Sequence, residues 1–599
     1  MDISTLQSQY REAKLDPAAL IEEIYSRIDA EGLHPVWISL VPKADNLARI
    51  QELAAGGKHD TLPLFGVPFA VKDNIDVVGL PTTAGCPAYA YQPSATATVV
   101  QKLLNAGAIL IGKTNMDQFA TGLVGTRSPY GVCSSVFSSE YISGGSSAGS
   151  AVAVASGLAS FSLGTDTAGS GRIPAAFNQI AGLKPTRGLI STSGVVPACR
   201  TLDCISIFAE TCSDAEKVFK VAQGFDSADP YSREQKFPHH VAWDATNFRF
   251  GVPQADQLQF LGDSGSAEAY AKAVQGAQQL GGTKVEIDLA PFRAAADLLY
   301  AGPWVAERLA AIQSFVAAHE TEMDPSVYKI ISGAQRFTAV DAFQSAYKLE
   351  KLRRTTSKVW ESIDVLLLPT APRTYSIAGV QASPIELNAS LGHYTNFVNL
   401  LDLAAVAIPA GSKADGLPFG ASLIGPAFTD TALLEVADRI HRHTTTTIAA
   451  SKRSLADTPV LHPPALPPGT MPIAVVGAHL TGQPFNWQLT ERRGKLLAAT
   501  KTLPGYRLFV LPNSTPAKPG LLYEPGFAGP GIELEVWALP IETVGSFLAL
   551  IPPPLAIGSI RLESGEIVKG FLCEPAGLAG AEEITHLRGW RSYIQQKTK

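Results

Sequence analysis

The sequence predicts an α/β protein with a large N-terminal domain and a smaller, β-rich α+β C-terminal domain. Three observations support this prediction. Short apolar runs, glycine-containing turns and helical segments alternate through the first two thirds of the chain, which is typical of a sheet flanked by helices. A proline-rich stretch follows residue 445 and suits a stiff linker. From Met471 onward, runs of β-branched, apolar and aromatic residues predominate.

The composition limits the class of protein. Of the 599 residues, 46% are hydrophobic and 17% are charged, against roughly 25% charged residues in typical soluble domains. A low charged fraction in a long chain favours a large buried core. The net charge of −6 and the lack of a Lys/Arg-rich tract argue against a nucleic-acid partner. No run reaches the ~18 uninterrupted apolar residues of a membrane helix, so we expect no membrane partner.

The cysteines show neither a CxxC pair nor the spacing of zinc ligands. They are Cys86, Cys133, Cys199, Cys204, Cys212 and Cys573. We therefore expect reduced, mostly buried thiols and no metal, and the chain contains no nucleotide-binding loop that would indicate a cofactor. The first residues lack the basic region and apolar core of a secretory signal, so the expected location is cytoplasmic.

The elements follow in order. Apolar residues at helical spacing predict helices at 16–29 and 43–53, the first opened by Asp16 as N-cap and Pro17 in the first turn. An apolar strand at 65–71 ends at Lys72. Further helices are predicted at 98–106, 150–158, 172–177 and 431–441, and further strands at 108–112, 161–165, 363–369, 404–409, 473–477, 506–510 and 534–539. In such a domain the functional residues lie on loops at strand ends.

These elements give three predicted regions. The first domain spans 1–445, because the strand and helix pattern continues to the helix near residue 441. Closely spaced prolines then mark a linker over 446–470, since proline interrupts both helix and sheet. The C-terminal domain spans 471–599. The chain shows no internal repeat.

One lysine and two serines in glycine-rich loops indicate acyl-transfer chemistry. They are Lys72, Ser146 and Ser170. A serine hydroxyl becomes a good nucleophile when a base removes its proton, and an unprotonated lysine on a buried strand end can be that base. The second serine can relay the proton. Taken singly, each residue has a simpler explanation, as a solvated charge or as a turn former.

Taken together, these residues identify a family. The segments 71–76, 144–154 and 164–175, with Lys72 and Ser146 74 positions apart and the two serines 24 apart, resemble the amidase signature family. The resemblance runs from about 63 to 188 and returns at 363–370. It implies a mixed sheet core flanked by helices and an enzyme that hydrolyses amides. It also implies a Ser–cis-Ser–Lys triad in which Ser170 is the nucleophile, Ser146 the bridging serine and Lys72 the base.

The same resemblance implies an oxyanion hole. It would consist of the backbone N–H groups of Thr167, Ala168, Gly169 and Ser170. Ala168 stands where many family members have glycine, which leaves the chemistry intact because the hole uses main-chain groups. Asp166 and Arg172 flank the nucleophile and are expected to form supporting hydrogen bonds, or only an ion pair.

Two segments narrow the substrate. Tyr300 and Arg308 lie eight residues apart, which on one helix is about two turns and so roughly one face. An arginine suits recognition of a carboxylate, although a surface arginine beside a core tyrosine is the alternative. The segments 300–308 and 122–131, the latter containing Gly125, resemble the allophanate hydrolases. That resemblance implies that Tyr300, Arg308 and Gly125 bind allophanate, a small anion, and that Ser170 attacks it to release ammonia.

The C-terminal domain adds a second resemblance. The segment 477–489 resembles the opening of the C-terminal domain of allophanate hydrolases, which is similar in fold to γ-glutamyl cyclotransferases. The resemblance implies decarboxylation of the first product, N-carboxycarbamate, with His479 as the catalytic group. Asn486, Gln488 and Lys518 could bind that dianion.

Alternatives remain open at this point. The chain could be a broad-specificity amidase whose C-terminal domain serves only dimerisation or stability. It could also be the amidase component of an RNA-dependent amidotransferase complex, or a non-enzymatic scaffold. For an allophanate hydrolase we expect a homodimer. Its substrate would come from a separate urea carboxylase or from enzymes of triazine breakdown.

Overall fold

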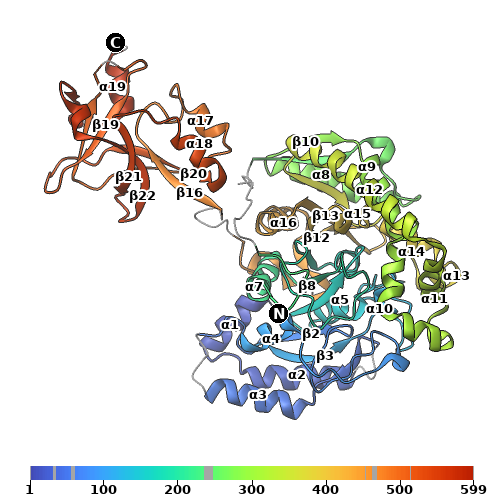
Figure 1. Ribbon diagram of the computed structural model, residues 1–599. Helices are drawn as coiled ribbons and strands as arrows, with labels where there is room; N and C mark the ends of the chain where they lie inside the picture. Colours follow the sequence, from blue (N-terminus) through green and yellow to red (C-terminus); the bar gives the residue numbers. More distant parts are fainter. Residues whose placement is uncertain are drawn as a thin grey trace. The chain divides into compact units, whose positions relative to one another are not determined.

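The computed structural model describes residues 2–30, 35–55, 61–234, 247–451, 453–461, 469–512 and 514–597 (Figure 1). The chain divides into two compact units. One comprises Met1–Gln235 and Ala245–His462, and the other includes Pro463–Lys599. Each unit has its own hydrophobic core and is described separately.

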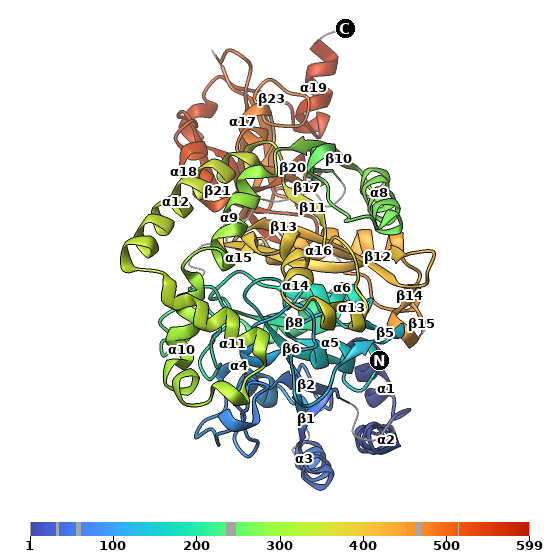
Figure 2. The ribbon, with the colours of Figure 1, turned by 90° about the vertical axis from the view of Figure 1, so that its right-hand side faces the viewer.

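The first unit is built on an eleven-stranded sheet. The sheet is mixed, as the family resemblance implies. In spatial order its strands are β1 (Trp37–Leu40), β3 (Ile109–Thr114), β2 (Pro68–Lys72), β6 (Phe161–Asp166), β8 (Cys204–Ala209), β7 (Ala181–Lys184), β12 (Leu403–Ser412), β13 (Pro418–Pro426), β11 (Val365–Pro369), β9 (Phe248–Pro253) and β10 (Gly282–Ile287). Figure 2 follows this order from β1 near α3 to β10 near α8. β2 runs parallel to both of its neighbours, whereas the pairs from β6 through β8, β7, β12 and β13 to β11 are antiparallel.

Helices flank this sheet (Figure 1). They are α1 (Ile3–Arg11), α2 (Pro17–Ala30), α3 (Lys43–Ala55), α4 (Thr98–Asn105), α5 (Ala148–Ala155), α6 (Ile173–Phe177), α7 (Cys212–Ala222), α8 (Ser264–Gln279), α9 (Ala290–Tyr300), α10 (Trp304–Ala318), α11 (Pro325–Ser332), α12 (Ala339–Ser357), α13 (Ile377–Ala382), α14 (Glu386–Leu391), α15 (Phe397–Leu400) and α16 (Asp430–Thr444). Two short hairpins pair β4 (Ser134–Ser135) with β5 (Ser138–Ile142), and β14 (Thr447–Ile448) with β15 (Arg453–Ser454).

α5 shows how the sequence positions the site. It consists of alanine, valine, glycine and serine alone, and every residue in it is buried. A helix that is apolar on all sides must lie inside the protein. Its small side chains let it pack closely on β2, β3 and β6. The serine loop that precedes it places Ser146 beside Lys72, at the end of β2.

The chain after α16 continues to pack on the first unit. Ile448, Ala449 and Leu455 lie in a buried cluster with residues of α5, and Arg453 forms ion pairs with Glu210 and Asp2. The described residues of 446–461 therefore contact the first unit. The rest of the predicted linker includes residues 452 and 462–468, which lie outside the described residues.

The second unit is β-rich. One sheet has the order β17 (Lys495–Lys501), β20 (Glu533–Pro540), β16 (Thr470–Val475), β22 (Ile567–Cys573) and β21 (Leu555–Arg561), and the other has the order β19 (Pro519–Tyr523), β18 (Tyr506–Val510) and β23 (Glu582–Glu583). In the described part of this unit, three helices accompany the sheets: α17 (Trp487–Thr490), α18 (Ile541–Leu548) and α19 (Trp590–Lys597). Phe547 and Trp590 from these helices belong to the same buried core as Leu539.

Three further findings concern chain-wide expectations. All six cysteines are free and buried, as predicted. Among the described helices, none combines the length and the apolar character that crossing a membrane requires. In the same residues, no group of three His, Cys, Asp or Glu side chains is arranged to hold a metal ion.

A buried ion pair generates a stability prediction. Lys113 Nζ on β3 lies 3.1 Å from the Asp73 carboxylate, and neither side chain is exposed. Replacing Lys113 by Met should lower the free energy of unfolding by about 3–5 kcal/mol, because the Asp73 charge would remain buried without its partner. The midpoint of urea unfolding of the first unit measures this loss.

Lys284→Met is the matched control. Lys284 and Glu286 are also 3.1 Å apart, but both are exposed, so the same substitution should change the free energy of unfolding by less than about 1 kcal/mol. Equal losses in the two variants would contradict the assignment of the larger effect to burial.

Candidate active sites

The three residues chosen from the sequence form one hydrogen-bonded chain. Lys72 lies at the end of β2, and its Nζ is 2.7 Å from Ser146 Oγ. Ser146 Oγ is in turn 3.0 Å from Ser170 Oγ. Lys72 and Ser146 are fully buried and Ser170 is 4% exposed. The arrangement can therefore pass a proton from the outermost serine to the amine.

Burial also tunes the lysine. Desolvation lowers the pKa of Lys72 to about 7, against the opposing effect of the carboxylates of Asp117, Asp166 and Asp203. The Arg308 guanidinium lowers it further. A neutral amine is therefore accessible near neutral pH, so the group can act as a base.

The loop that carries Ser146 leaves no space for larger residues. The Gly145–Ser146 peptide is cis, and a Cβ on Gly145 would collide with Asp117 Oδ2. Gly125 lies behind this loop with φ of +75°, and a Cβ there would come within 2.6 Å of Gly144 O. Its N–H donates to Asp117 Oδ2 at 3.0 Å, so Gly125 supports the serine loop through Asp117.

The turn after β6 presents its main-chain N–H groups. Within the described residues, no protein group accepts a hydrogen bond from the N–H of Thr167, Ala168, Gly169 or Ser170. Gly169 has φ of +145° and packs on Thr395, where a Cβ would lie 2.5 Å from Oγ1. Buried N–H groups without an acceptor are uncommon, and here they are free to stabilise a developing oxyanion.

Asp166 and Arg172 support this turn by hydrogen bonds and charge together. Arg172 Nε and Nη2 donate to the two oxygens of Asp166, each at 2.9 Å, and the guanidinium also donates to Thr395 O. Burial raises the pKa of Asp166, but the charge and hydrogen bonds of Arg172 outweigh that effect and lower it overall. The carboxylate therefore stays ionised.

Tyr300 and Arg308 meet, but not on one helix. α9 ends at Tyr300 and α10 begins at Trp304, so the predicted single helix is wrong. The physical reason is Pro303, which has no N–H for the helix and restricts the backbone of Gly302 before it. The turn nevertheless brings the side chains together, with Arg308 Nη2 donating to Tyr300 Oη at 3.2 Å.

Arg308 is 2% exposed and contacts the loop next to the nucleophile. Its Nη1 donates to Ala120 O at 3.2 Å and to Thr121 Oγ1 at 3.1 Å. The next residue, Gly122, accepts a hydrogen bond from Ser170 Oγ at 3.4 Å. A ligand bound to Arg308 would therefore lie close to Ser170.

Sequence reasoning missed three polar residues of this site. Thr165 Oγ1 is the second partner of Lys72 Nζ, at 2.7 Å. Asp117 accepts hydrogen bonds from the N–H groups of Gly125 and Arg127, and Asp203 accepts one from Thr167 Oγ1. Thr165 could have been found, because it precedes Asp166 on the strand before the nucleophile. No local pattern marks Asp117 or Asp203.

His479 in the second unit lies in an aromatic environment. Its ring is stacked on Phe571 at 4.9 Å between centroids and also contacts Phe547 and Phe485. Burial lowers the pKa of His479, with a smaller contribution from the Lys518 charge and an opposing one from Gln488. The imidazole is therefore neutral at neutral pH.

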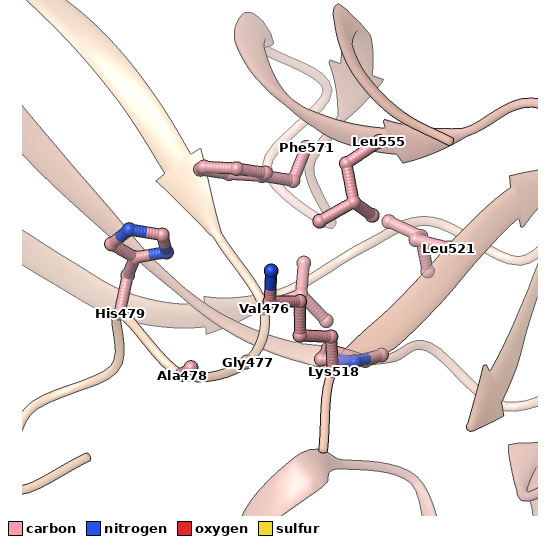
Figure 3. A pocket seen from close by; sticks show the side chains of 9 residues that line it. Val476, Gly477, Ala478, His479, Lys518, Leu521, Leu555 and Phe571 are labelled. Carbon is pink, nitrogen blue, oxygen red and sulfur yellow. The ribbon is translucent and has the colours of Figure 1, made fainter. Parts of the chain in front are cut away.

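A pocket opens beside this histidine (Figure 3). Its lining consists of Val476, Gly477, Ala478, His479, Lys518, Pro519, Leu521, Leu555 and Phe571. Asn486 and Gln488 are not among the lining residues. Asn486 Nδ2 donates to His479 O at 2.8 Å, and Gln488 Oε1 is 2.9 Å from His479 Nε2, so both hold the histidine.

Comparison with known families matches both units. The amidase family matches residues 19–434, which is more than half of the chain. The family described as "Allophanate hydrolase C-terminal domain" matches residues 471–595. The two matches follow each other along the chain without overlap.

Individual relatives agree with these families. The structure of Kluyveromyces lactis allophanate hydrolase is 42% identical, with a TM-score of 0.85 over 100% of this chain and 99% of that one. Urea amidolyase of Saccharomyces cerevisiae is 45% identical over 597 residues, or 97% of this chain and 32% of the relative. The chain thus spans about a third of the length of that protein. A glutamyl-tRNA(Gln) amidotransferase component from Synechococcus sp. is 34% identical over 65% of this chain and 85% of the relative.

The amidase match agrees with the geometry of the first site, which combines a lysine, two serines and free main-chain N–H groups. The second match and the full-length structural similarity extend the agreement to the β-rich unit. The RNA-linked relatives match a smaller part of the chain at lower identity, which makes that alternative the weaker one. The chain belongs to the amidase family, amide hydrolases, and has the two-domain architecture of the allophanate hydrolases.

Proposed function

We propose that this protein hydrolyses allophanate in its first unit and promotes decarboxylation of the product, N-carboxycarbamate, in its second. The observation that carries the proposal is the hydrogen-bonded series Lys72–Ser146–Ser170 beside a buried Arg308. The lysine and the two serines supply the groups for hydrolysis. The buried Arg308 suits a substrate that is small and negatively charged. Overall the reaction gives ammonia and CO₂.

The first step uses a neutral Lys72. The amine accepts the Ser146 proton while Ser146 accepts that of Ser170, whose Oγ attacks the terminal amide carbonyl of allophanate. The N–H groups of Thr167, Ala168, Gly169 and Ser170 stabilise the oxyanion. The relayed proton returns to the departing nitrogen, ammonia leaves, and water then cleaves the acyl-enzyme to N-carboxycarbamate.

Arg308 binds the substrate carboxylate in this proposal. Its Nη1 is occupied by the Ala120–Thr121 loop and one Nη2 hydrogen by Tyr300, whereas within the described residues Nε has no acceptor. An Nε–Nη2 edge is the geometry that pairs with a carboxylate in a bidentate way. Tyr300 fixes the guanidinium, and Gly125 supports the serine loop behind the substrate.

His479 serves the second step. It lies in a pocket with Lys518, whose charge suits the dianionic N-carboxycarbamate, while Asn486 and Gln488 hold the imidazole. Similarity to the allophanate hydrolase C-terminal domain supports this role. We propose domain limits of 1–445 and 471–599, joined by a segment 446–470 whose described part as far as residue 461 packs on the first domain.

The cellular context follows from the relatives and the reaction. Similarity to urea amidolyases supports a link to a urea carboxylase, and enzymes of triazine breakdown are the other source of allophanate. We place the protein in the cytoplasm, where such substrates arise.

We also propose a homodimer. α12 carries an exposed apolar stripe of Val340, Phe343 and Tyr347, which are 63%, 63% and 64% exposed and lie at helical spacing along one side. Large exposed apolar side chains grouped in this way are typical of protein–protein interfaces. A second copy of the chain is the expected occupant.

The pH dependence of hydrolysis tests the base. kcat/KM for ammonia release from allophanate should rise with pH through about 7 and then level off, since only unprotonated Lys72 can accept a proton. Lys72→Met should lose about 10²- to 10⁴-fold. Assays omit RNA, ATP and partner chains. An unchanged acidic limb in the variant, or full activity, would contradict the role of Lys72.

Substrate charge tests Arg308. Arg308→Met should weaken binding of allophanate by about 1.5–3 kcal/mol, because a charged hydrogen bond is lost, and should raise KM. Hydrolysis of a neutral aliphatic amide should lose much less activity, and Arg336→Met on the exposed surface is the control. Equal losses on the anionic and the neutral substrate would sink the assignment and favour a broad amidase.

Analytical ultracentrifugation tests the dimer. Phe343→Glu should shift the protein from dimer to monomer, because a charge would be buried in the interface without a partner. Phe225 is 56% exposed elsewhere on the unit, so Phe225→Glu should leave the dimer intact. A monomeric wild-type chain, or a dimer unaffected by Phe343→Glu, would rule out this interface.

A further inference from the structure

The pocket of the second unit combines one amine, one imidazole and an apolar wall. Lys518 and His479 line it together with Leu521, Leu555 and Phe571, which form the wall. In Figure 3 the Lys518 amine points between the His479 ring and Phe571. This division of the pocket assigns different tasks to the two nitrogen bases, and the inference rests on the function proposed above.

The histidine presents a lone pair to a ligand. Gln488 Oε1 can only accept a hydrogen bond, so His479 Nε2, at 2.9 Å from it, carries the ring proton. In a neutral imidazole the other nitrogen, Nδ1, is then an acceptor. Burial among three aromatic rings lowers the pKa of His479 and keeps the ring neutral. The imidazole can therefore orient a substrate N–H but has no proton to give from Nδ1.

The lysine is available to a ligand. Among the described residues no carboxylate forms an ion pair with Lys518 Nζ, and its nearest aromatic partner is Phe485 at 5.9 Å from the ring centroid. Its main-chain N–H donates to Ser514 Oγ at 3.0 Å, which fixes the start of the side chain at the pocket edge. An ammonium group held in this way is a proton donor as well as a charge.

We propose that Lys518 is the general acid of the decarboxylation and that the wall of Leu521, Leu555 and Phe571 receives the departing CO₂. His479 Nδ1 accepts the N–H of N-carboxycarbamate and orients its nitrogen. The C–N bond to one carboxylate breaks, its electron pair stays on nitrogen, and the Lys518 ammonium proton moves to that nitrogen. The products are CO₂ and carbamate, and the neutral amine regains a proton from solvent.

The apolar wall favours this direction of cleavage. A carboxylate placed against Leu521, Leu555 and Phe571 loses hydration, whereas CO₂ is neutral and needs none. As the C–N bond breaks, the negative charge therefore moves from the carboxylate against the apolar wall to the nitrogen, where the proton from Lys518 neutralises it. The removal of water lowers the barrier because the ground-state anion loses more solvation than the transition state.

Lys518→Arg separates proton donation from charge. Arginine keeps the positive charge but does not lose its proton in proteins, so it can bind the dianion and cannot act as the acid. The full chain is given ¹³C-labelled allophanate in mildly alkaline buffer, where carbamates decompose slowly. Membrane-inlet mass spectrometry follows CO₂, ¹³C NMR follows N-carboxycarbamate, and a coupled assay follows the first equivalent of ammonia.

In Lys518→Arg the first ammonia should appear at the wild-type rate, while CO₂ release slows by about 10²-fold and N-carboxycarbamate accumulates. The His479→Ala variant gives the rate of CO₂ release without assistance by the pocket, for comparison. Wild-type CO₂ release in Lys518→Arg, or equal rates in wild type and His479→Ala, would overturn the proposal. A wild-type chain that yields no ammonia from allophanate would instead overturn the proposed function.

Leu555→Asn tests the wall. Asparagine is similar in size to leucine but hydrates the leaving carboxylate, so CO₂ release should slow by about tenfold with the first ammonia unchanged. Leu550 is 46% exposed and does not line the pocket, so Leu550→Asn is the matched control. Unchanged CO₂ release in Leu555→Asn would remove the wall from the mechanism.

Discussion

The burial of one amine governs the chemistry of the first unit. In the proposed mechanism Lys72 can act as a base because burial removes its hydration and thereby favours the neutral amine. That requirement explains the surrounding architecture. β2 lies between two parallel strands, α5 covers their ends with small side chains, and the serine loop covers the amine. The nearby carboxylates oppose this lowering of the pKa. The pKa of Lys72 therefore stays near neutral pH, where the proposed mechanism needs the amine both to take and to return a proton.

The two sites use desolvation in opposite ways. In the first unit it prepares the enzyme, because the group that loses its charge is a side chain. In the proposed second step, the apolar wall of the pocket would destabilise charge on the ligand, next to the Lys518 amine. Both sites are assembled from strand ends and the loops that follow them, where backbone turns can bring distant residues together.

The sequence was sufficient where local pattern and chemistry coincide. Lys72 could be predicted because an apolar strand ends at it, and Ser146 and Ser170 because glycine-rich loops mark them. The strand and helix pattern indicated the α/β class. The order of the eleven strands could not be predicted, since it depends on pairings between distant segments, such as that of β7 with β12. Asp117 and Asp203 could not be predicted either, because their place in the site also depends on contacts between separate segments of the chain. Tyr300 and Arg308 were paired correctly through a wrong local structure, because a turn at Pro303 can bring two side chains together as well as a continuous helix can.

Arg453 has a consequence for how this unit can be combined with others. It joins Asp2, near the start of the unit, to Glu210, and it belongs to the segment that closes the unit after α16. The beginning and the end of the catalytic unit are thus fastened at one place on its surface. A domain whose ends meet can be attached to, or inserted within, a longer polypeptide with little disturbance of its interior. The amidase unit is in this sense a portable module, and the long relatives that contain a similar region illustrate one way in which such a module can be used.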